Sequence, residues 1–365
     1  MIRIGSGDLT IESSASALRS ALALSCASGL PFQWEGFRRK GKGSASPGLR
    51  PVDVESVRLF AQITGARVDG GGVGEDTVAL DPGAVRPGEH RFDVLADEPM
   101  MPLLRAALLP LALHGRESTL RIAGSTHAPE GETFEVVSST FLYFLGKLGI
   151  EVSLALECAG FAPRGGGEVS ARLASGSSGP SGPSGPSGSV AAWEPLVLVD
   201  REELASIQIV SAGASLPAHV QQRQAARARS GVHISGLEPT VQLLKLRARS
   251  AGSVVAITGR FGEVPVTFAC VSERGKSAES VGEEAAQAFR HFANQPGVVP
   301  EILVDSLLLF LAFAQGESRI AISRLPAVAP GLAALIRAFT GREVEIDGKV
   351  GRHARIRIAG PKLQT

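Results

Sequence analysis

Segments with apolar residues at helical spacing recur along the chain, and most of them are followed by a glycine. Apolar positions three and four residues apart predict a helix with one buried face. A glycine just after such a segment favours the left-handed backbone that ends a helix. The pattern predicts helices over residues 16–28, 53–63, 102–114, 135–148, 302–314 and 332–339. The glycines that would end them are Gly29, Gly65, Gly115, Gly149, Gly316 and Gly341.

Short strand-like stretches lie between these helices, at residues 31–37, 78–80, 119–122, 150–156, 168–173, 319–322 and 343–346. Three pieces, 63–68, 147–152 and 339–344, share one helix–glycine–strand form, and residues 114–120 resemble 315–320. Such repetition implies one supersecondary unit used several times. The predicted fold class is therefore α+β, in α/β layers, with three repeated units that each pack two helices on a small β-sheet.

Two segments interrupt the repeat. Residues 175–189 are Gly, Pro and Ser almost throughout, which predicts a flexible solvated linker. Residues 213–286 fit the repeat poorly and contain a basic helical segment at 219–229, so we expect an inserted small α/β subdomain there. The predicted order is repeat unit 1 at 1–85, repeat unit 2 at 86–174, the linker at 175–189, and repeat unit 3 at 190–212 and 287–365, on either side of the inserted subdomain at 213–286.

The composition limits the classes of partner. The formal net charge of the 365 residues is +1, so the overall charge favours neither nucleic acid nor membrane, and a polyanion site has to be a local patch. No apolar run reaches spanning length, and the N-terminus has no apolar signal segment. Cys26, Cys158 and Cys270 lie far apart, which argues against a disulfide framework or a zinc site. We expect a cytoplasmic protein with no membrane partner.

Two local patterns suggest phosphate chemistry. Arg164 precedes three consecutive glycines in residues 160–169, and glycine allows a backbone to approach a ligand closely. A flexible turn between two strands explains the same pattern equally simply. Arg38, Arg39, Lys40 and Lys42 form the densest basic cluster, in a Gly/Ser-rich stretch that could wrap a phosphodiester. A solvated charge run is the ordinary alternative.

Several motifs together resemble the RNA 3′-terminal phosphate cyclase family, over nearly the whole length of the chain. The strongest is Gly160-Phe161-x-Pro163-Arg164-Gly165-Gly166-Gly167-Glu168-Val169, which matches the family signature almost letter for letter. Further matches are Glu12 with the helix at residues 18–25, Pro47-Gly48-Leu49-Arg50-Pro51, Thr126-His127-x-Pro129, Leu216-Pro217-x-His219-Val220 and Ala278-Glu279-Ser280-Val281. The family fold, three repeated α/β units plus one inserted domain, agrees with the repeats described above.

The resemblance implies a function. In the family, a histidine attacks the α-phosphate of ATP with help from a divalent metal (Mg or Mn), AMP passes to an RNA 3′-phosphate, and the 2′-hydroxyl displaces AMP to leave a 2′,3′-cyclic phosphate. By this resemblance RNA 3′ ends are the partner, and DNA is not expected. The implied catalytic residues are Glu12, also a metal ligand, and Arg19. RNA and phosphate contacts would come from Arg38, Arg39, Lys42 and Arg164, and nucleotide contacts from Arg105, Glu301 and Asp305.

The sequence departs from the family at the positions that carry this chemistry. The nucleophilic histidine belongs to a region that here is Arg324-Leu325-Pro326-Ala327-Val328-Ala329-Pro330-Gly331-Leu332. Of the family's His-x-x-Asp-Gln segment only Asp305 remains, and two family glutamines are Ser16 and Arg105. A glycine-rich turn is Leu95-Ala96-Asp97-Glu98-Pro99, and a Gln-His pair is Val52-Asp53. Alanine or valine cannot carry a phosphoramidate.

Three hypotheses remain open at this point. The first is an ATP-dependent RNA 3′-phosphate cyclase with altered chemistry or a relocated nucleophile, for which His353 is a candidate. The second is a catalytically inactive homologue that binds RNA or a ribonucleoprotein, which the missing histidine favours. The third is a small-molecule enzyme on the same repeated fold.

Overall fold

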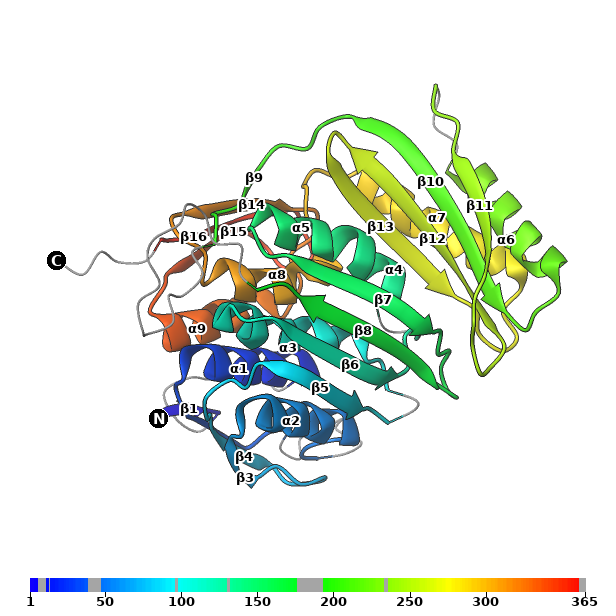
Figure 1. Cartoon of the computed structure of the whole chain (residues 1–365). Helices are drawn as coiled ribbons and strands as arrows, with labels where there is room; N and C mark the ends of the chain where they lie inside the picture. Colours follow the sequence, from blue (N-terminus) through cyan, green and yellow to red (C-terminus); the bar gives the residue numbers. More distant parts are fainter. Residues whose placement is uncertain are drawn as a thin grey trace.

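The computed structural model describes residues 1–5, 11–12, 14–38, 47–95, 98–129, 132–175, 193–232 and 236–360. Within these ranges the chain forms separate four-stranded sheets with helices packed between and beside them (Figure 1). The α+β class predicted from the sequence is confirmed. Among the described helices, none is long and apolar enough to cross a lipid bilayer.

Three of the sheets have the same connectivity, which confirms the repeated unit. The first sheet has the order β1 (Ile2–Ile4), β2 (Phe32–Glu35), β4 (Thr77–Asp81), β3 (Arg67–Gly70). The second has the order β5 (Gly88–Asp93), β6 (Ser118–Gly124), β8 (Gly167–Leu173), β7 (Val152–Cys158). The third has the order β9 (Val197–Leu198), β14 (Ser318–Ile322), β16 (Ala354–Ile358), β15 (Val344–Gly348). In each sheet the first two strands are parallel and the other two pairings are antiparallel.

The helices of these units meet in the middle of the molecule (Figure 1). Helix α1 (Ala15–Ser28) contacts α2 (Pro51–Thr64), α3 (Met101–His114), α8 (Val304–Leu311) and α9 (Ala329–Thr340). Because it is enclosed on almost every side, nine of its residues are buried, and four of these are Ala17, Ala21, Ala23 and Ser20. Small side chains allow the neighbouring helices to approach closely, which accounts for the alanine-rich composition of this helix.

The predicted helix ends are confirmed where glycine supplies the left-handed conformation. Gly29 has φ of 73° and donates its N–H to the carbonyl of Ser25 after α1. Gly341 has φ of 69° and donates to the carbonyl of Arg337 after α9. A residue with a Cβ would be strained at this backbone angle, so the glycines fix where the helices stop.

The predicted helix over residues 135–148 differs from expectation in its middle. It consists of α4 (Phe134–Val136), a π-helical turn η1 (Val137–Phe141) and α5 (Leu142–Lys147). The hydroxyl of Thr140, on this wider turn, accepts a hydrogen bond of 2.9 Å from the N–H of Thr267. The irregular turn is thus used to join the second unit to a strand more than a hundred residues later.

The fourth sheet has its own connectivity and lies between β9 and α8 in the sequence. Its order is β11 (Thr240–Lys245), β10 (Leu204–Ala214), β12 (Gly252–Phe261), β13 (Val264–Val271), and it is covered by α6 (Ala218–Gly231) and α7 (Ala278–Ala293). A short 3₁₀ turn η2 (Glu301–Leu303) leads into α8. Strand β10 begins before residue 213, where the sequence analysis starts the inserted subdomain. The residue limits of the four units remain a prediction.

Candidate functional site

A cavity of about 550 Å³ opens where α1, α3 and α8 meet, and we call it the helical cavity. Its polar lining comes from segments far apart in sequence: Ser16 and Arg19 on α1, Arg105 on α3, Glu132 in the loop before α4, Glu301 and Asp305 around the start of α8, and Arg324 after β14. Residues 325–328 and 350–351 complete the wall. The structure thus brings Arg19, which the resemblance implies is catalytic, together with the implied nucleotide contacts Arg105, Glu301 and Asp305.

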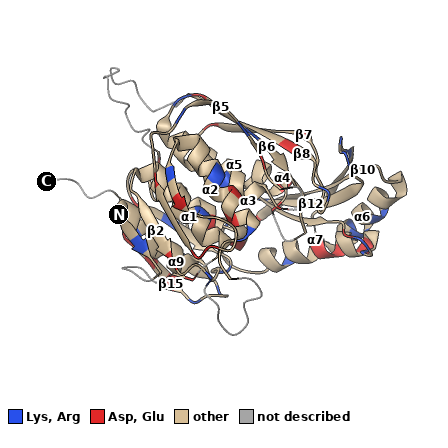
Figure 2. Cartoon of the chain, turned by 90° about the horizontal axis from the view of Figure 1, so that it is seen from below, with Lys and Arg blue, Asp and Glu red and all other residues tan. Residues whose placement is uncertain are grey.

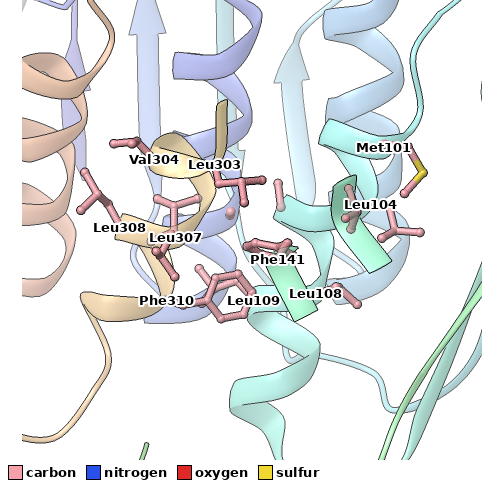
Figure 3. Packing of buried hydrophobic residues seen from close by; sticks show 14 of the residues in the cluster. Met101, Leu104, Leu108, Leu109, Phe141, Leu303, Val304, Leu307, Leu308 and Phe310 are labelled. Atoms are coloured by element: carbon pink, nitrogen blue, oxygen red, sulfur yellow. The ribbon is translucent and has the colours of Figure 1, made fainter. Parts of the chain in front are cut away.

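Arg105 is the most buried cation of the helical cavity, with 1% of its side chain exposed. Its Nη2 donates to the Glu132 carboxylate and, at 3.2 Å, to Oδ1 of Asp305. Its guanidinium also lies over the Phe141 ring, 5.3 Å from the ring centroid. Figure 3 shows the apolar layer in this region, where Phe141 meets side chains of α3 and α8. A guanidinium placed on such a layer needs carboxylate partners, because an unpaired charge there would lack solvation.

The two carboxylates respond differently to this environment. Burial raises the pKa of Glu132 to about 8, although the Arg105 guanidinium opposes the rise. Burial also acts to raise the pKa of Asp305, but Arg105, a hydrogen bond from Ser16 and Arg19 outweigh it and hold that pKa below its usual value. Asp305 is therefore the permanent anion of the cavity, while Glu132 gains or loses a proton near neutral pH.

Asp305 is held by residues from three directions. The hydroxyl of Ser16 donates to its Oδ2 at 2.8 Å, and the N–H of Ser306 donates to its Oδ1 at 2.7 Å. Ser16 and Arg105 both stand where the family resemblance implies glutamine, and both bind this aspartate. The two residues that differ from the family pattern therefore bind the same retained carboxylate, that of Asp305.

The wall formed by residues 324–328 carries no histidine, and none of the histidines that the structure describes lines the helical cavity. Arg324, at the start of this wall, lies 3.5 Å from the carboxylate of Glu301 in a half-exposed ion pair. His353 follows the wall residues 350–351, but its Nδ1 lies 2.8 Å from the carbonyl oxygen of Ile322. His353 is thus engaged with the backbone of β14 rather than with the cavity.

Glu12 and His127 lie outside the lining of the helical cavity. Glu12 is exposed, and its neighbour Ile11 packs against Gly331 at the start of α9. His127 is fully buried; its Nε2 lies 3.0 Å from Glu135, and its ring stacks on Phe161 with centroids 4.9 Å apart. The burial and these contacts give His127 a structural place between β6 and the glycine-rich loop.

The glycine-rich loop at residues 160–167 shapes a second cavity, of about 440 Å³, which we call the signature cavity. Glycines are required because the chain folds tightly on itself: a Cβ on Gly160 would lie 2.3 Å from the N atom of Gly167. The lining includes residues 161–164, Leu216, Val220, residues 250–253, Arg274, Lys276 and Ala278. Arg164 lies here, and the two cavities share no lining residue. The structure therefore separates Arg164 from the predicted nucleotide residues.

Arg38 is the described member of the basic cluster, since Arg39, Lys40 and Lys42 lie outside the described residues. Its guanidinium pairs with the fully buried carboxylate of Asp53, which also accepts a 2.8 Å hydrogen bond from the N–H of Arg50. Asp53 thus caps α2 and neutralises Arg38 at the position where the resemblance implies a histidine. Arg38 would have to leave this partner to bind a phosphate.

The arginines of α6 are paired with glutamates. Arg223 lies 2.6 Å from Glu279, Arg227 lies 3.0 Å from Glu283, and Arg229 lies 3.0 Å from Glu238. Figure 2 shows blue and red residues together on α6 and α7. The basic segment seen in the sequence is therefore a mixed-charge helix pair on the surface.

The implied divalent metal has no protein-made site in the part of the chain that the structure describes. No group of three or more His, Cys, Asp or Glu side chains there is close enough to hold a metal ion. In the helical cavity, the guanidinium of Arg105 binds Glu132 and Asp305 as a cation would. The residues of this cavity do not fit a resident metal.

The residues that sequence reasoning missed are Glu132 and Arg324 in the helical cavity and Ser250 and Arg274 in the signature cavity. Glu132 lies in a loop, where no hydrophobic period signals burial. Arg274 follows β13 in a turn, and nothing local distinguishes it from a solvated cation. The sequence feature that could have pointed to Arg274 is the family-like Ala278–Val281 motif, which begins four residues after it.

Comparison with known proteins identifies the family. The family model described as RNA 3′-terminal phosphate cyclase matches residues 10–346. Three proteins named RNA 3′-terminal phosphate cyclase illustrate the similarity. The Methylococcus capsulatus protein is 29% identical over 86% of this chain and 84% of its own. The Ectopseudomonas mendocina protein is 32% identical over 82% and 83%. The Thermococcus gammatolerans protein is 27% identical over 95% of each chain.

A solved structure, the enolpyruvyl transferase NikO from Streptomyces tendae, is similar over 99% of this chain and 81% of its own. The identity is 12% and the TM-score is 0.27, which is too low to indicate a shared fold. The family model, by contrast, spans most of the chain. The chain belongs to the RNA 3′-terminal phosphate cyclase family.

Proposed function

We propose that this chain binds the 3′-phosphate end of RNA together with ATP at the helical cavity and converts the end to a 2′,3′-cyclic phosphate. The observation that carries the proposal is the set of charged residues from three repeated units, Arg19, Arg105 and Asp305, that meet in one cavity of a chain belonging to this family. Arg19 and Arg324 are the cations that would contact phosphate oxygens, while Arg105 holds the carboxylates in place.

The wall at residues 324–328 has no nucleophile, so the proposed reaction transfers AMP directly. An oxygen of the RNA 3′-phosphate attacks the α-phosphorus of ATP and displaces pyrophosphate, which leaves AMP joined to the RNA end. The 2′-hydroxyl then attacks the terminal RNA phosphorus, gives its proton to solvent and displaces AMP. Both steps are in-line displacements that depend on positioning and charge rather than on a covalent enzyme intermediate.

A second candidate function is RNA binding without chemistry, as a scaffold for RNA or a ribonucleoprotein. The observation in its favour is that no histidine that the structure describes lines the helical cavity. The similarity to proteins named as cyclases over most of their lengths favours the enzymatic proposal. We also propose a cytoplasmic location, because the three cysteines are free.

The test is conversion of a short 3′-phosphorylated RNA to a phosphatase-resistant cyclic end, with and without ATP. We expect ATP-dependent conversion and, with α-labelled ATP, no protein adduct after denaturation. Arg19→Gln should lower conversion by roughly 100-fold, while Arg116→Gln, an exposed arginine outside both cavities, should not. A labelled adduct would overturn direct transfer. RNA binding without conversion would establish the second candidate.

A further inference from the structure

We propose that the signature cavity is a separate binding site for a phosphate group. It is formed by the glycine-rich loop and the inserted sheet, shares no residue with the helical cavity, and does not depend on chemistry there. Three observations on the described residues point to an anionic ligand: two cations without a described partner, a buried hydroxyl without one, and the start of a long helix.

The cations of this cavity differ in their pairing. Lys276 lies 2.9 Å from Glu273 and 2.6 Å from Glu284, so its charge is satisfied by the protein. Arg164 and Arg274 are exposed, and neither has an ion pair or hydrogen bond to another residue that the structure describes. Two guanidiniums at one cavity with no carboxylate partner repel each other, and an anion between them would relieve that repulsion.

The second observation is the hydroxyl of Ser250. This side chain lines the cavity and is only 7% exposed, yet its Oγ has no hydrogen-bond partner among the described residues. The neighbouring polar groups are satisfied, since the Ser253 hydroxyl accepts from Gln224 Nε2 at 2.7 Å. A buried hydroxyl without a partner is rare because its desolvation is not repaid, so a bound acceptor is the natural explanation.

The third observation is the position of α7, which begins at Ala278 in the cavity lining. The first N–H groups of a helix have no partner within the helix, and the helix dipole favours an anion near them. This helix has 16 residues, long enough for a full dipole. The hydroxyl of Ser277 already accepts the N–H of Ser280 at 3.0 Å, so this helix start adds its positive dipole end rather than a set of free donors.

The walls of the cavity are fixed in place. Phe161 packs so closely on the inserted sheet that a Cβ on Gly252 would lie 2.2 Å from its ring. The N–H of Ala159 donates to the carbonyl of Arg247 at 2.7 Å, which ties the strand before the loop to the insert. A fixed backbone around the cavity lowers the entropy lost when a ligand binds, because only side chains have to be ordered.

The chemistry fits a phosphate mono- or diester more closely than other ligands. Among the described residues of the lining, the carboxylate of Glu273 is paired with Lys276, and the unpaired groups are two guanidiniums and a hydroxyl, which do not suit a metal ion. The cavity of about 440 Å³ is larger than one phosphate group. The phosphate could therefore belong to the RNA backbone or to a small phosphorylated molecule. These two sources share one chemistry and differ in what surrounds the phosphate.

The experiment measures binding to the full chain in the absence of ATP. One arm titrates inorganic phosphate by calorimetry, and the other titrates a labelled RNA with a 3′-hydroxyl end by fluorescence anisotropy at low salt. The test variants are Arg274→Gln and Ser250→Ala. The matched control is Arg260→Gln, an exposed arginine at the opposite end of strand β12 from the cavity.

We expect Arg274→Gln to weaken binding about tenfold and Ser250→Ala about threefold, while Arg260→Gln matches the parent. A loss in the RNA arm alone identifies the RNA backbone as the source, and a loss in the phosphate arm alone identifies a small ligand. If the parent binds neither ligand, or if Arg274→Gln binds both as Arg260→Gln does, the proposal is wrong. Since the RNA has no 3′-phosphate and ATP is absent, failure of the cyclase proposal leaves this result unaffected.

Discussion

The two cavities each hold arginines whose ion pairing differs. In the helical cavity Arg105 is bound to Glu132 and Asp305, and Arg324 is bound to Glu301. In the signature cavity Arg164 and Arg274 have no partner among the residues that the structure describes. A cation already paired inside the protein must exchange its partner before it binds a substrate phosphate, whereas an unpaired one is ready.

The same division runs through the sequence motifs. Three stretches that match the family, at residues 160–169, 216–220 and 278–281, contribute to the lining of the signature cavity. The positions that depart from it, Ser16, Arg105 and residues 324–328, line the helical cavity. The helical cavity also holds Arg19 and Asp305, which agree with the family pattern, so it combines matching and departing positions, whereas the glycine-rich loop of the signature cavity matches throughout.

The largest expected effect on stability comes from removing Arg105. Arg105→Ala leaves Asp305 charged without its buried partner, leaves Glu132 buried and alone, and opens space above Phe141. We expect a loss of about 3–4 kcal/mol in the free energy of unfolding, measured by urea denaturation at pH 7. Arg274→Ala, the corresponding change in the signature cavity, should cost less than about 0.5 kcal/mol.

A second variant separates charge from packing. Arg105→Met combined with Glu132→Gln fills the space and removes one of the two carboxylates, so it should recover part of the loss seen with Arg105→Ala. If Arg105→Ala instead unfolds as the parent does, the ion pairs of the helical cavity do not hold it together, and the contrast between the two cavities fails.

Local patterns predicted the helices, the glycine caps and the repeated unit, because these depend on residues near one another in sequence. The pairing of charges depends on long-range contacts and could not be predicted. Arg105 and Asp305 are 200 residues apart, and only the fold brings them within 3.2 Å. The same holds for Arg164. The resemblance grouped it with Arg38 as a phosphate contact, but the structure ties Arg38 to Asp53 and places Arg164 at the signature cavity.

The raised pKa of Glu132 should make the stability of the protein depend on pH. The unfolded carboxyl loses its proton near pH 4.5, but the folded one keeps it to about pH 8. The folded state therefore binds more protons between these values, so stability should fall as pH rises, by at most about 1.4 kcal/mol per unit, with no further loss above pH 8. Glu132→Gln cannot titrate and should flatten this slope. Parallel stability curves for parent and variant between pH 5 and 8 would contradict the raised pKa.

Two serines give a matched pair of smaller changes. Ser16→Ala removes the 2.8 Å hydrogen bond to Asp305 and should cost about 1–2 kcal/mol. Ser250→Ala removes a buried hydroxyl that has no partner in the described structure, so without ligand it should be neutral or slightly stabilising. Thermal unfolding of both variants in phosphate-free buffer tests this. Equal losses would mean that the Ser250 hydroxyl has a partner in the free protein.

The smallest expected effect concerns Glu301, which is 45% exposed and pairs with Arg324 at 3.5 Å. Because a half-exposed ion pair contributes little, Glu301→Gln should change the free energy of unfolding by less than about 0.5 kcal/mol. It should nevertheless convert Arg324 from a paired to an unpaired cation, as Arg164 is in the signature cavity. Titration with ATP at low salt should then show binding about two- to threefold tighter, with the gain lost at high salt.

Arg324→Gln in the same assay should weaken binding and abolish the effect of Glu301→Gln. If the Glu301 variant binds ATP as the parent does, pairing inside the protein is not what limits phosphate binding at the helical cavity.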